Sequence, residues 1–388
     1  MLPLEDVKVL DFSQSAAGPF CGMLLGDMGA EVIKVEPLTG DAFRPLLGGA
    51  WSLILNRNKR SIALNLRTEE GKEVALKLAK DTDIFLEAFT PGTIGKLGLS
   101  YDVVNNINPR VIYCSLSGYG QEGPYSPRAG YDVCSQAECG LMAATGEPDG
   151  DYVRIGASLI DYGTGMFAMI GMLLALKVRE KTGKGQKIDV SLFDTGITWM
   201  NYWFANYAMT DRNPPRLGSG HEFATPYQVF HTKDNPIFIG VAGDKAFQAF
   251  CKEVGLENLL EDPKFNTGLN RLQNRNELVN IVQERVKKFT REEMIQKLDP
   301  YGVPYAPVNT ISEVTQDPHI KARGTLVEMD SEKGKLKVPG VTSFRLSETP
   351  GSIRRPAPRI GEHSEEILTE LGYSSEAITQ LREKQVIL

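Results

Sequence analysis

The first 120 residues alternate between short apolar runs and segments with helical spacing. The apolar runs VKVLDF, EVIKVE, RSIALNL, DIFLEAF and RVIYCSLSGYG are typical of buried strands. Helical spacing separates them at 19–29, at 69–80 and after Tyr101. Because repeated strand-helix-strand units place successive strands parallel, the sequence predicts an α/β fold with a Rossmann-like parallel sheet.

The turn after the first predicted strand argues against a dinucleotide-binding enzyme. It reads SQSAAGPF, whereas a dinucleotide pyrophosphate needs the glycines of GxGxxG at this helix start. An NAD-dependent enzyme is therefore not expected.

Changes in composition divide the chain into three parts. Residues 1–210 are predicted to form the N-terminal part of a large domain, which ends at the Pro/Gly-rich stretch DRNPPRLGSG. Residues 211–328 are predicted to form a smaller α/β domain, with strands YQVFHT and IFIGVA and helices at 245–254, 271–289 and 291–298. Residues 329–388 are predicted to return to the large domain.

Charge and cysteine content narrow the class of partner. A net charge of −6 and a pI near 5.5 argue against a broad nucleic-acid surface and favour a small-molecule substrate. Five widely spaced cysteines without a CxxC pair, and four scattered histidines, predict neither a disulfide framework nor a metal site. The acidic start MLPLEDVKVLDF and a longest apolar run of only 166–176 predict a cytoplasmic protein without a membrane span.

Asp161 is a lone carboxylate at the start of an apolar helix pattern, GASLIDYGTGMFAMIGMLLAL. Aspartate is among the best N-cap residues, so a structural role at the helix start is one interpretation. The other is a nucleophile, because a carboxylate held by helix-terminal amides stays ionised near neutral pH. In this interpretation Gly163 and Gly165 leave room for a bulky substrate. The two roles can coexist, and the residues alone leave both open.

Three further segments are candidates for ligand binding. NRNKRSIALNLR, residues 56–67, places four cations around one strand, which suits either a solvated edge or the phosphates of a nucleotide. SLSGYGQEGPY, residues 115–125, follows a strand end, where open parallel sheets bind ligands. LGSGH, residues 217–221, is either a linker or a loop that offers backbone amides to an oxyanion.

With these residues in view, the chain resembles the class III CoA-transferases of the CaiB/BaiF type, the family of formyl-CoA transferase. The resemblance covers nearly the whole sequence and rests on an ordered set of segments. They are LDFSQSAAGPF, DMGAEVIKVEPLTGD, NRNKRSIALNL, LEAFTPGTIGKLGLSY, NPRVIYCSLSGYGQEGPY, AGYDVCSQAECGLM, the Asp161 segment, TGKGQKIDVSLFD, GVPYAPV and IGEHSEEIL.

The resemblance implies an interlocked homodimer, in which each chain passes through a hole in the other, and a CoA-transferase activity (EC 2.8.3). Coenzyme A would move from an acyl-CoA to a free carboxylic acid through an aspartyl anhydride and an aspartyl-CoA thioester on Asp161, without a metal. The loop Gly218, Ser219 and Gly220 would face the acyl group. The CoA contacts that carry over are Ala16, Ala17, Leu64, Asn65, Leu66, Arg67, Phe89, Lys96, Arg128, Tyr131 and Asp132.

Some positions depart from the pattern of formyl-CoA transferase. Pro37 stands where that enzyme has an arginine at the nucleotide, Ala88 replaces an asparagine, and GSGH is shorter than its glycine run. These changes weaken a formyl or oxalate specificity.

Two other functions are compatible with the resemblance. An α-methylacyl-CoA racemase needs a histidine base beside the aspartate, but that motif here reads AGYD, with Tyr131 at the histidine position. Because an unperturbed tyrosine is a poor base at neutral pH, the transferase is favoured. A catalytically silent CoA-binding protein would leave the position of Asp161 unexplained.

Overall fold

The computed structural model describes residues 1–331, 334–341 and 344–388. They form two compact units. Unit 1 comprises Met1–Leu141, Arg154–Phe204 and Lys321–Leu388, and unit 2 comprises Met142–Val153 and Ala205–Ile320. The domain boundaries at 210 and 328 stay a prediction.

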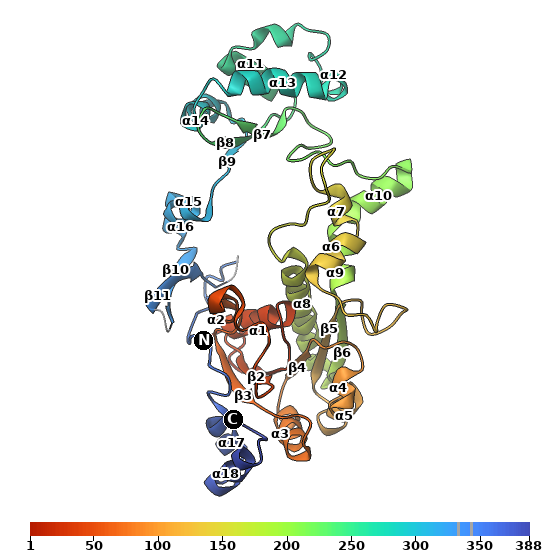
Figure 1. Ribbon diagram of the computed structural model, residues 1–388, viewed down its shortest axis with the longest axis vertical. Coiled ribbons are helices and arrows are strands. Elements are labelled where there is room, and N and C mark those ends of the chain that lie inside the picture. Colours follow the sequence, from red (N-terminus) through yellow and green to blue (C-terminus); the bar gives the residue numbers. More distant parts are fainter. Residues whose placement is uncertain (332–333, 342–343) are drawn as a thin grey trace. The chain divides into compact units, whose positions relative to one another are not determined.

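A six-stranded parallel sheet forms the centre of unit 1 (Figure 1). Its order is β3-β2-β1-β4-β5-β6, and every neighbouring pair is parallel. The strands are β1 (Lys8–Asp11), β2 (Glu31–Glu36), β3 (Lys59–Ala63), β4 (Ile84–Glu87), β5 (Ile112–Ser117) and β6 (Gln186–Ser191). The predicted α/β fold with a parallel sheet is confirmed.

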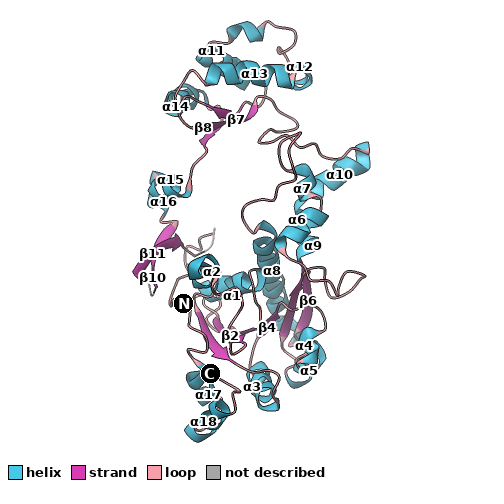
Figure 2. Cartoon of the chain, in the orientation of Figure 1, coloured by secondary structure: helices cyan, strands magenta, loops and turns pink. Residues whose placement is uncertain are grey.

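Helices cover both faces of this sheet (Figure 2). One apolar core joins alternate strand residues to α1 (Ala17–Asp27) and α8 (Leu159–Thr182). The other joins the intervening strand residues to α3 (Glu69–Lys80), α5 (Tyr101–Ile107), α17 (Ser364–Glu370) and α18 (Ser375–Glu383). Because successive side chains of a strand point to opposite faces, β1, β2, β4 and β5 contribute to both cores.

Local signals explain where several helices begin. Thr68 caps α3 by accepting a hydrogen bond from the Gly71 amide, with Glu69 and Glu70 in the first turn and lysines in the last. Thr290 and Glu293 form a capping box at α14 (Arg291–Leu298). The predicted helices at 69–80 and 291–298 are therefore confirmed.

Helix α8 is long and apolar enough to cross a membrane. It packs instead against α1, β5 and β6 in the first core, and 44% of its apolar window is buried inside the structure. It is therefore a core helix of unit 1.

Shorter elements complete unit 1. They are η1 (Leu46–Gly49), α2 (Ala50–Leu55), α4 (Thr93–Lys96), α6 (Asp132–Glu138), α9 (Leu192–Trp199) and the antiparallel pair β10 (Leu326–Ser331) and β11 (Gly334–Pro339). Three helices span the unit boundaries: α7 (Leu141–Ala144), α10 (Asn201–Thr210) and α16 (Pro318–Arg323).

Unit 2 has its own core around a three-stranded antiparallel sheet. The strands are β7 (Tyr227–His231), β8 (Pro236–Gly240) and β9 (Tyr305–Pro307). The helices are α11 (Asp244–Val254), α12 (Gly268–Gln273), α13 (Arg275–Val286), α14 and α15 (Ile311–Gln316), with the short turns η2 (Glu257–Leu260) and η3 (Asp299–Tyr301).

The single helix predicted at 271–289 is wrong, because two helices meet there at Asn274. The Asn274 side chain donates to the carbonyl of Asn270, 2.9 Å away, and its backbone (φ −109°, ψ 28°) leaves the helical range. Asparagine competes with the helix in this way through its own side-chain hydrogen bonds.

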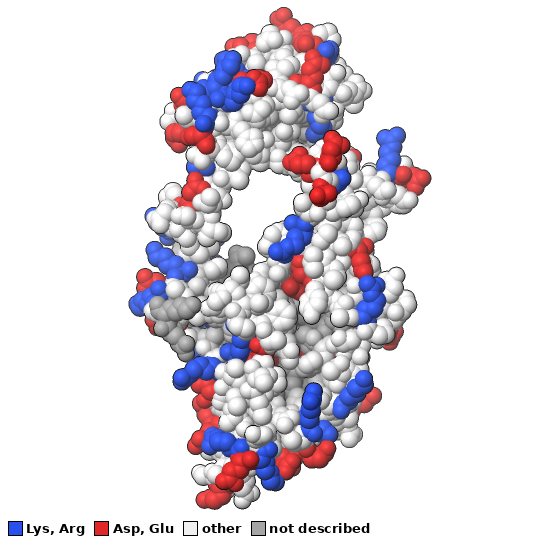
Figure 3. Space-filling model, in the orientation of Figure 1, with Lys and Arg blue, Asp and Glu red and all other residues white. Residues whose placement is uncertain are grey.

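Acidic and basic side chains are interspersed on the face shown in Figure 3. This mixture accords with the modest net charge of −6.

Candidate active site

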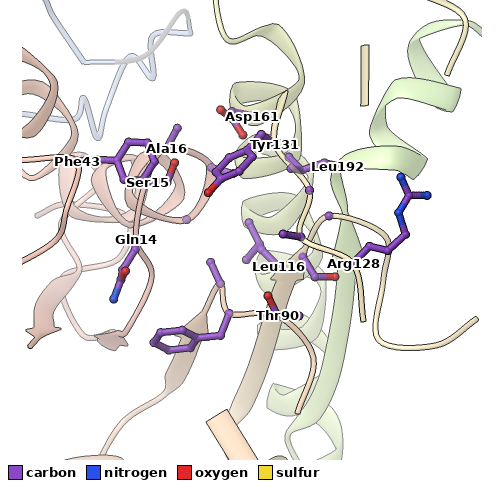
Figure 4. Close-up of a pocket in the computed structure, with 18 residues that line it drawn as sticks. Gln14, Ser15, Ala16, Phe43, Thr90, Leu116, Arg128, Tyr131, Asp161 and Leu192 are labelled. Atoms are coloured by element: carbon purple, nitrogen blue, oxygen red, sulfur yellow. The ribbon is translucent and has the colours of Figure 1, made fainter. Parts of the chain in front are cut away.

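A pocket in unit 1 lies at the carboxyl ends of β1, β4 and β5. Strands β1 and β4 are neighbours although β2 and β3 follow β1 in the chain, so the strand order changes direction here. Open parallel sheets bind ligands at such a switch point. The lining residues are Gln14, Ser15, Ala16, Ala17, Gly18, Phe43, Ala88, Phe89, Thr90, Leu116, Ser117, Gly118, Arg128, Ala129, Gly130, Tyr131, Asp161 and Leu192 (Figure 4).

Buried ion pairs hold the loop after β1 that forms one wall. Lys59 Nζ lies 2.9 Å from Asp11 Oδ2, and both side chains are fully buried. Asp11 also accepts hydrogen bonds from the amide and hydroxyl of Ser13, whose carbonyl in turn accepts one from Lys34 Nζ at 2.7 Å. These contacts hold the loop against β1, β2 and β3.

Close approaches shape the end of this loop. Ser15 has a positive φ of 67°, and its carbonyl accepts a hydrogen bond from Trp51 Nε1 at 2.9 Å. A Cβ at Gly18 would lie 2.2 Å from the Ser13 Cβ, so only glycine fits there. These contacts bring Ala16 and Ala17 to the pocket at the start of α1.

Asp161 is the third residue of α8 and lines the same pocket. The N-cap of α8 is Ser158, so the interpretation of Asp161 as the N-cap is wrong. Figure 4 shows Asp161 and Tyr131 at the same end of the pocket, with Arg128 on the opposite side from Ser15 and Phe43. Asp161 is therefore part of the pocket wall.

The surroundings of Asp161 oppose its ionisation. Burial, and next the negative charge of Asp132, raise the pKa of Asp161 to about 7. Within the part of the chain that the structure describes, no donor forms a hydrogen bond with the Asp161 carboxylate. The expectation that helix-terminal amides keep this carboxylate ionised is wrong, because those amides have another partner.

That partner is Asp132, the first residue of α6. Its Oδ2 accepts hydrogen bonds from the amides of Ile160 at 2.8 Å and Asp161 at 3.1 Å. Its Oδ1 accepts one from the Gln136 side chain. Asp132 is 7% exposed and does not line the pocket, so its predicted contact with CoA stays a prediction.

Gly163 and Gly165 serve helix packing rather than substrate access. A Cβ at Gly165 would lie 2.6 Å from the Ala17 carbonyl, and one at Gly163 would lie 2.7 Å from the Trp199 ring. The room that these glycines provide is therefore filled by α1 and by Trp199. Their packing brings α8 close to the loop that carries Ala16 and Ala17.

Most cations of segment 56–67 belong to structural ion pairs. Arg57 pairs with Asp27 at 2.6 Å, Lys59 with Asp11, and Arg60 with Glu31, Glu366 and Glu370. All three cations are buried, so the interpretation of this cluster as a phosphate site is wrong for them. Arg67 differs because its side chain is exposed.

The structure brings six of the predicted site residues together in the pocket: Ala16, Ala17, Phe89, Arg128, Tyr131 and Asp161. Leu64, Asn65, Leu66 and Arg67 follow β3 at the same carboxyl edge of the sheet, outside the pocket lining. Lys96 ends α4, and its side chain is exposed. Neither Arg67 nor Lys96 forms an ion pair with another described residue.

Arg128 is held by two aromatic rings. Its guanidinium carbon lies 4.7 Å from the ring centre of Tyr119 and 4.6 Å from that of Tyr125. Arg128 Nη2 also pairs with Glu138 at 2.6 Å. Stacking and pairing together orient this cation at the pocket.

The loop of Gly218, Ser219 and Gly220 belongs to unit 2. The Gly218 amide donates to the Gly146 carbonyl at 2.8 Å, and Ser219 Oγ accepts from the Val229 amide at 3.0 Å. At Gly218 φ is 59°, which favours glycine, and a Cβ would lie 2.5 Å from the Glu147 carboxylate, which would have to move. The loop is a fixed turn in unit 2, and its role toward the acyl group stays a prediction.

Sequence reasoning missed part of the pocket lining. Gln14, Ser15 and Thr90 follow β1 and β4, and Phe43 follows β2. The sequence did point to these residues. Open parallel sheets bind ligands where their strands end, and this rule, which selected residues 115–125, also applies to the loops after β1, β2 and β4. That rule did find Leu116, Ser117 and Gly118.

No cluster of three His, Cys, Asp or Glu side chains that could hold a metal occurs among residues 1–331, 334–341 and 344–388. The metal-free enzyme remains an expectation.

Comparisons with known proteins identify the family. The family model "CoA-transferase family III" matches residues 4–364. The chain is 39% identical to human succinyl-CoA:glutarate CoA-transferase, covering 99% of this chain and 90% of that protein. It is 40% identical to the succinyl-CoA--L-malate CoA-transferase beta subunit of Chloroflexus aurantiacus, covering 100% and 98%. A crystal structure of a CaiB/BaiF family protein from Brucella suis matches with a TM-score of 0.87 at 36% identity, covering 95% and 99%. The chain therefore belongs to CoA-transferase family III, the class III or CaiB/BaiF enzymes (EC 2.8.3), which transfer coenzyme A between acyl-CoA and carboxylic acids.

Proposed function

We propose that this enzyme exchanges coenzyme A through covalent intermediates on Asp161. An Asp161 oxygen attacks the thioester carbonyl of the donor acyl-CoA, the C–S bond breaks, and CoA thiolate leaves an acyl-aspartyl anhydride. The thiolate then attacks the Asp161 carbonyl, which forms aspartyl-CoA thioester and releases the donor acid.

The acceptor acid reverses these steps. Its carboxylate attacks the aspartyl thioester, so a second anhydride forms and CoA thiolate leaves again. The thiolate attacks the acceptor's acyl carbonyl, which yields the new acyl-CoA and frees the Asp161 carboxylate. Each step exchanges one bond to an acyl carbon for another, and no oxidant or reductant is needed.

One observation carries this proposal: the Asp161 carboxylate lines the switch-point pocket, and none of the described residues supplies a paired cation or a hydrogen-bond donor to it. A carboxylate with a pKa near 7 is more basic, and hence more nucleophilic, than one with an ordinary pKa. Still, at pH 8 most of it is ionised and able to attack.

We propose that the acids are short dicarboxylic acids, with succinyl-CoA as a donor. The support is the activity for which the two relatives above are named, which is transfer from succinyl-CoA to glutarate or to L-malate. Arg128 is the cation of the described pocket lining and is a candidate to attract the second carboxylate.

The racemase alternative receives no support from the pocket. No histidine is among its described lining residues, and Tyr131 takes the position where a second base would be required. A silent CoA-binding protein would not need a carboxylate that is held without a counter-charge at the binding site.

The interlocked homodimer is also a proposal, supported by an apolar row on α8. Met166, Ile170, Leu174 and Val178 follow one another at four-residue intervals and are 43%, 51%, 63% and 48% exposed. Covering such a row stabilises a protein in water, and a second copy of the chain would cover it. Cytoplasmic location likewise stays a prediction.

Incubation of the enzyme with succinyl-CoA and glutarate tests the proposed function. The expected product is glutaryl-CoA, detected by chromatography and mass spectrometry. With succinyl-CoA alone, hydroxylamine should convert Asp161 to its hydroxamate, visible as a mass change of the peptide that contains it. Exchange without any adduct on Asp161 would contradict the covalent route.

A further inference from the structure

The first turn of α8 is capped from another helix. Its own N-cap residue, Ser158, makes no side-chain capping bond. Instead, Asp132 Oδ2 accepts hydrogen bonds from the amides of Ile160 and Asp161, the second and third residues of the helix. A carboxylate at this position satisfies amides that the helix itself leaves unpaired.

Gln136, one turn after Asp132 on α6, completes this arrangement. Its Nε2 donates to Asp132 Oδ1, and its Oε1 accepts from the Ile155 amide at 2.9 Å. Gln136 is fully buried and Asp132 nearly so. The two side chains therefore hold the backbone at both ends of segment 155–161, including the backbone of Asp161.

This arrangement also sets the charge around Asp161. The amides at the helix start are used by Asp132, so they do not stabilise the Asp161 carboxylate. Asp132 adds a buried negative charge, and no described cation is paired with it.

Other ionisable groups lie on the elements packed against α8. They are Cys21 and Asp27 on α1, Tyr113 and Cys114 on β5, Cys134 and Glu138 on α6, Lys187 and Asp189 on β6, and Asp194 on α9. On α8 itself Tyr162 follows Asp161, and Arg128 and Tyr131 line the pocket. Of these, Asp27 is paired with Arg57 and Glu138 with Arg128. Asp132 is the group whose charge acts on Asp161.

We propose that Asp132 is a positioning residue for the transfer reaction, which fixes the backbone of Asp161 and withholds the helix-terminal amides from its carboxylate. The inference rests on the proposed covalent role of Asp161. Acylation of Asp161 converts an anion into a neutral anhydride, with the electron pair leaving on the CoA sulfur. A neighbouring anion therefore disfavours the free carboxylate relative to the anhydride, and this difference favours attack.

The substitution Asp132→Asn tests the charge while an amide oxygen still accepts from Ile160 and Asp161. We expect the acid limb of the pH profile of kcat/KM for acyl-CoA to move down by at least half a pH unit. We also expect kcat at pH 8 to fall several-fold, because Asp161 becomes less basic. A residue that only stabilises the fold would lower activity without moving this limb.

The double variant Asp132→Asn/Gln136→Glu restores the hydrogen-bond partners, since the asparagine amide can donate to the new carboxylate. It keeps the geometry but moves the charge one helical turn away from Asp161. Its acid limb should also lie below that of the wild type, and its thermal stability should be closer to the wild type than that of Asp132→Asn. If Asp132→Asn fails to fold, this double variant still tests how the charge of Asp132 affects the acid limb.

Asp194→Asn is the matched control, because Asp194 is an exposed carboxylate on α9, which also packs against α8. Its acid limb should coincide with that of the wild type. This inference alone would be overturned if the acid limb of the pH profile stayed in place in both Asp132 variants while the wild type still formed a hydroxylamine adduct on Asp161. Absence of the adduct in the wild type would overturn the covalent function and this inference with it.

Discussion

The carboxylates on the two sides of the pocket have opposite surroundings. Beneath the loop after β1, Asp11 is fully buried but lies 2.9 Å from Lys59, and Glu36 pairs with Arg44 at 2.5 Å. Burial alone would raise the pKa of both, but the adjacent cations and hydrogen bonds lower it below its usual value. Across the pocket, no cation of the described residues is paired with Asp161, and burial beside Asp132 raises its pKa to about 7.

The difference shows that burial does not by itself make a carboxylate reactive. Asp11 and Glu36, each with a paired cation, are stable as anions, and they hold the backbone in place. A buried carboxylate with an anionic neighbour is unstable as an anion, and a reaction that neutralises it is favoured. The first kind builds the wall of this pocket, and the second kind is its candidate nucleophile.

Replacing the candidate nucleophile should have the largest effect. Asp161→Asn keeps the shape of the side chain but removes the attacking oxygen anion, so we expect kcat for CoA exchange to fall on the order of 10³-fold or more. Circular dichroism and gel filtration should match the wild type. Turnover within about tenfold of the wild type would exclude Asp161 as the nucleophile.

Breaking a structural pair should instead destabilise the fold. Lys59→Met leaves the buried Asp11 without its paired cation, which should lower the free energy of unfolding by about 3–5 kcal/mol in urea titrations. The double variant Lys59→Met/Asp11→Leu removes both charges and should recover most of that loss. If the single variant were as stable as the wild type, the contrast between the two kinds of carboxylate would fail.

Replacing Asp161 should change the free energy of unfolding in the opposite direction. Its pKa is raised from 3.8 to about 7, so the folded state binds a proton that the unfolded state releases between these values, and stability falls as pH rises through this window. Asp161→Asn should therefore increase the free energy of unfolding at pH 8 by about 2 kcal/mol, and this gain should shrink as pH falls toward 5. If Asp161→Asn were less stable than the wild type at pH 8, or stabilised equally at pH 8 and pH 5, the pKa of Asp161 would not be raised in the folded protein.

Exposed cations at the sheet edge should have the smallest effect. Arg67→Gln and Lys96→Gln each remove a charge that has no described partner, so we expect KM for acyl-CoA to rise by about three- to tenfold at low salt with kcat unchanged. Lys181→Gln, at the far end of α8, is the control and should leave KM unchanged. If all three variants behaved alike, the proposed role of Arg67 and Lys96 in binding CoA would be wrong.

Sequence patterns predicted the sheet of unit 1 well, because each strand is a short apolar run between helices that carry their own caps. The strand EVIKVE and the helix at 69–80 agree with the structure residue for residue. Prediction failed where side chains far apart in sequence decide the outcome. Arg57 and Lys59 resemble a phosphate site in the sequence, but their partners Asp27 and Asp11 lie about 30 to 48 residues away, on other elements.

The sequence by itself determined the family, the α/β architecture and the choice of Asp161, since these follow from local apolar periodicity and from an ordered set of motifs. Only the tertiary structure decided what surrounds that carboxylate. Asp132 and Asp161 are 29 residues apart, and nothing in their spacing indicates that one caps the helix of the other. The reactivity of a charged group depends on the groups that the fold packs around it, and hydrogen bonds and burial become visible only when distant segments meet.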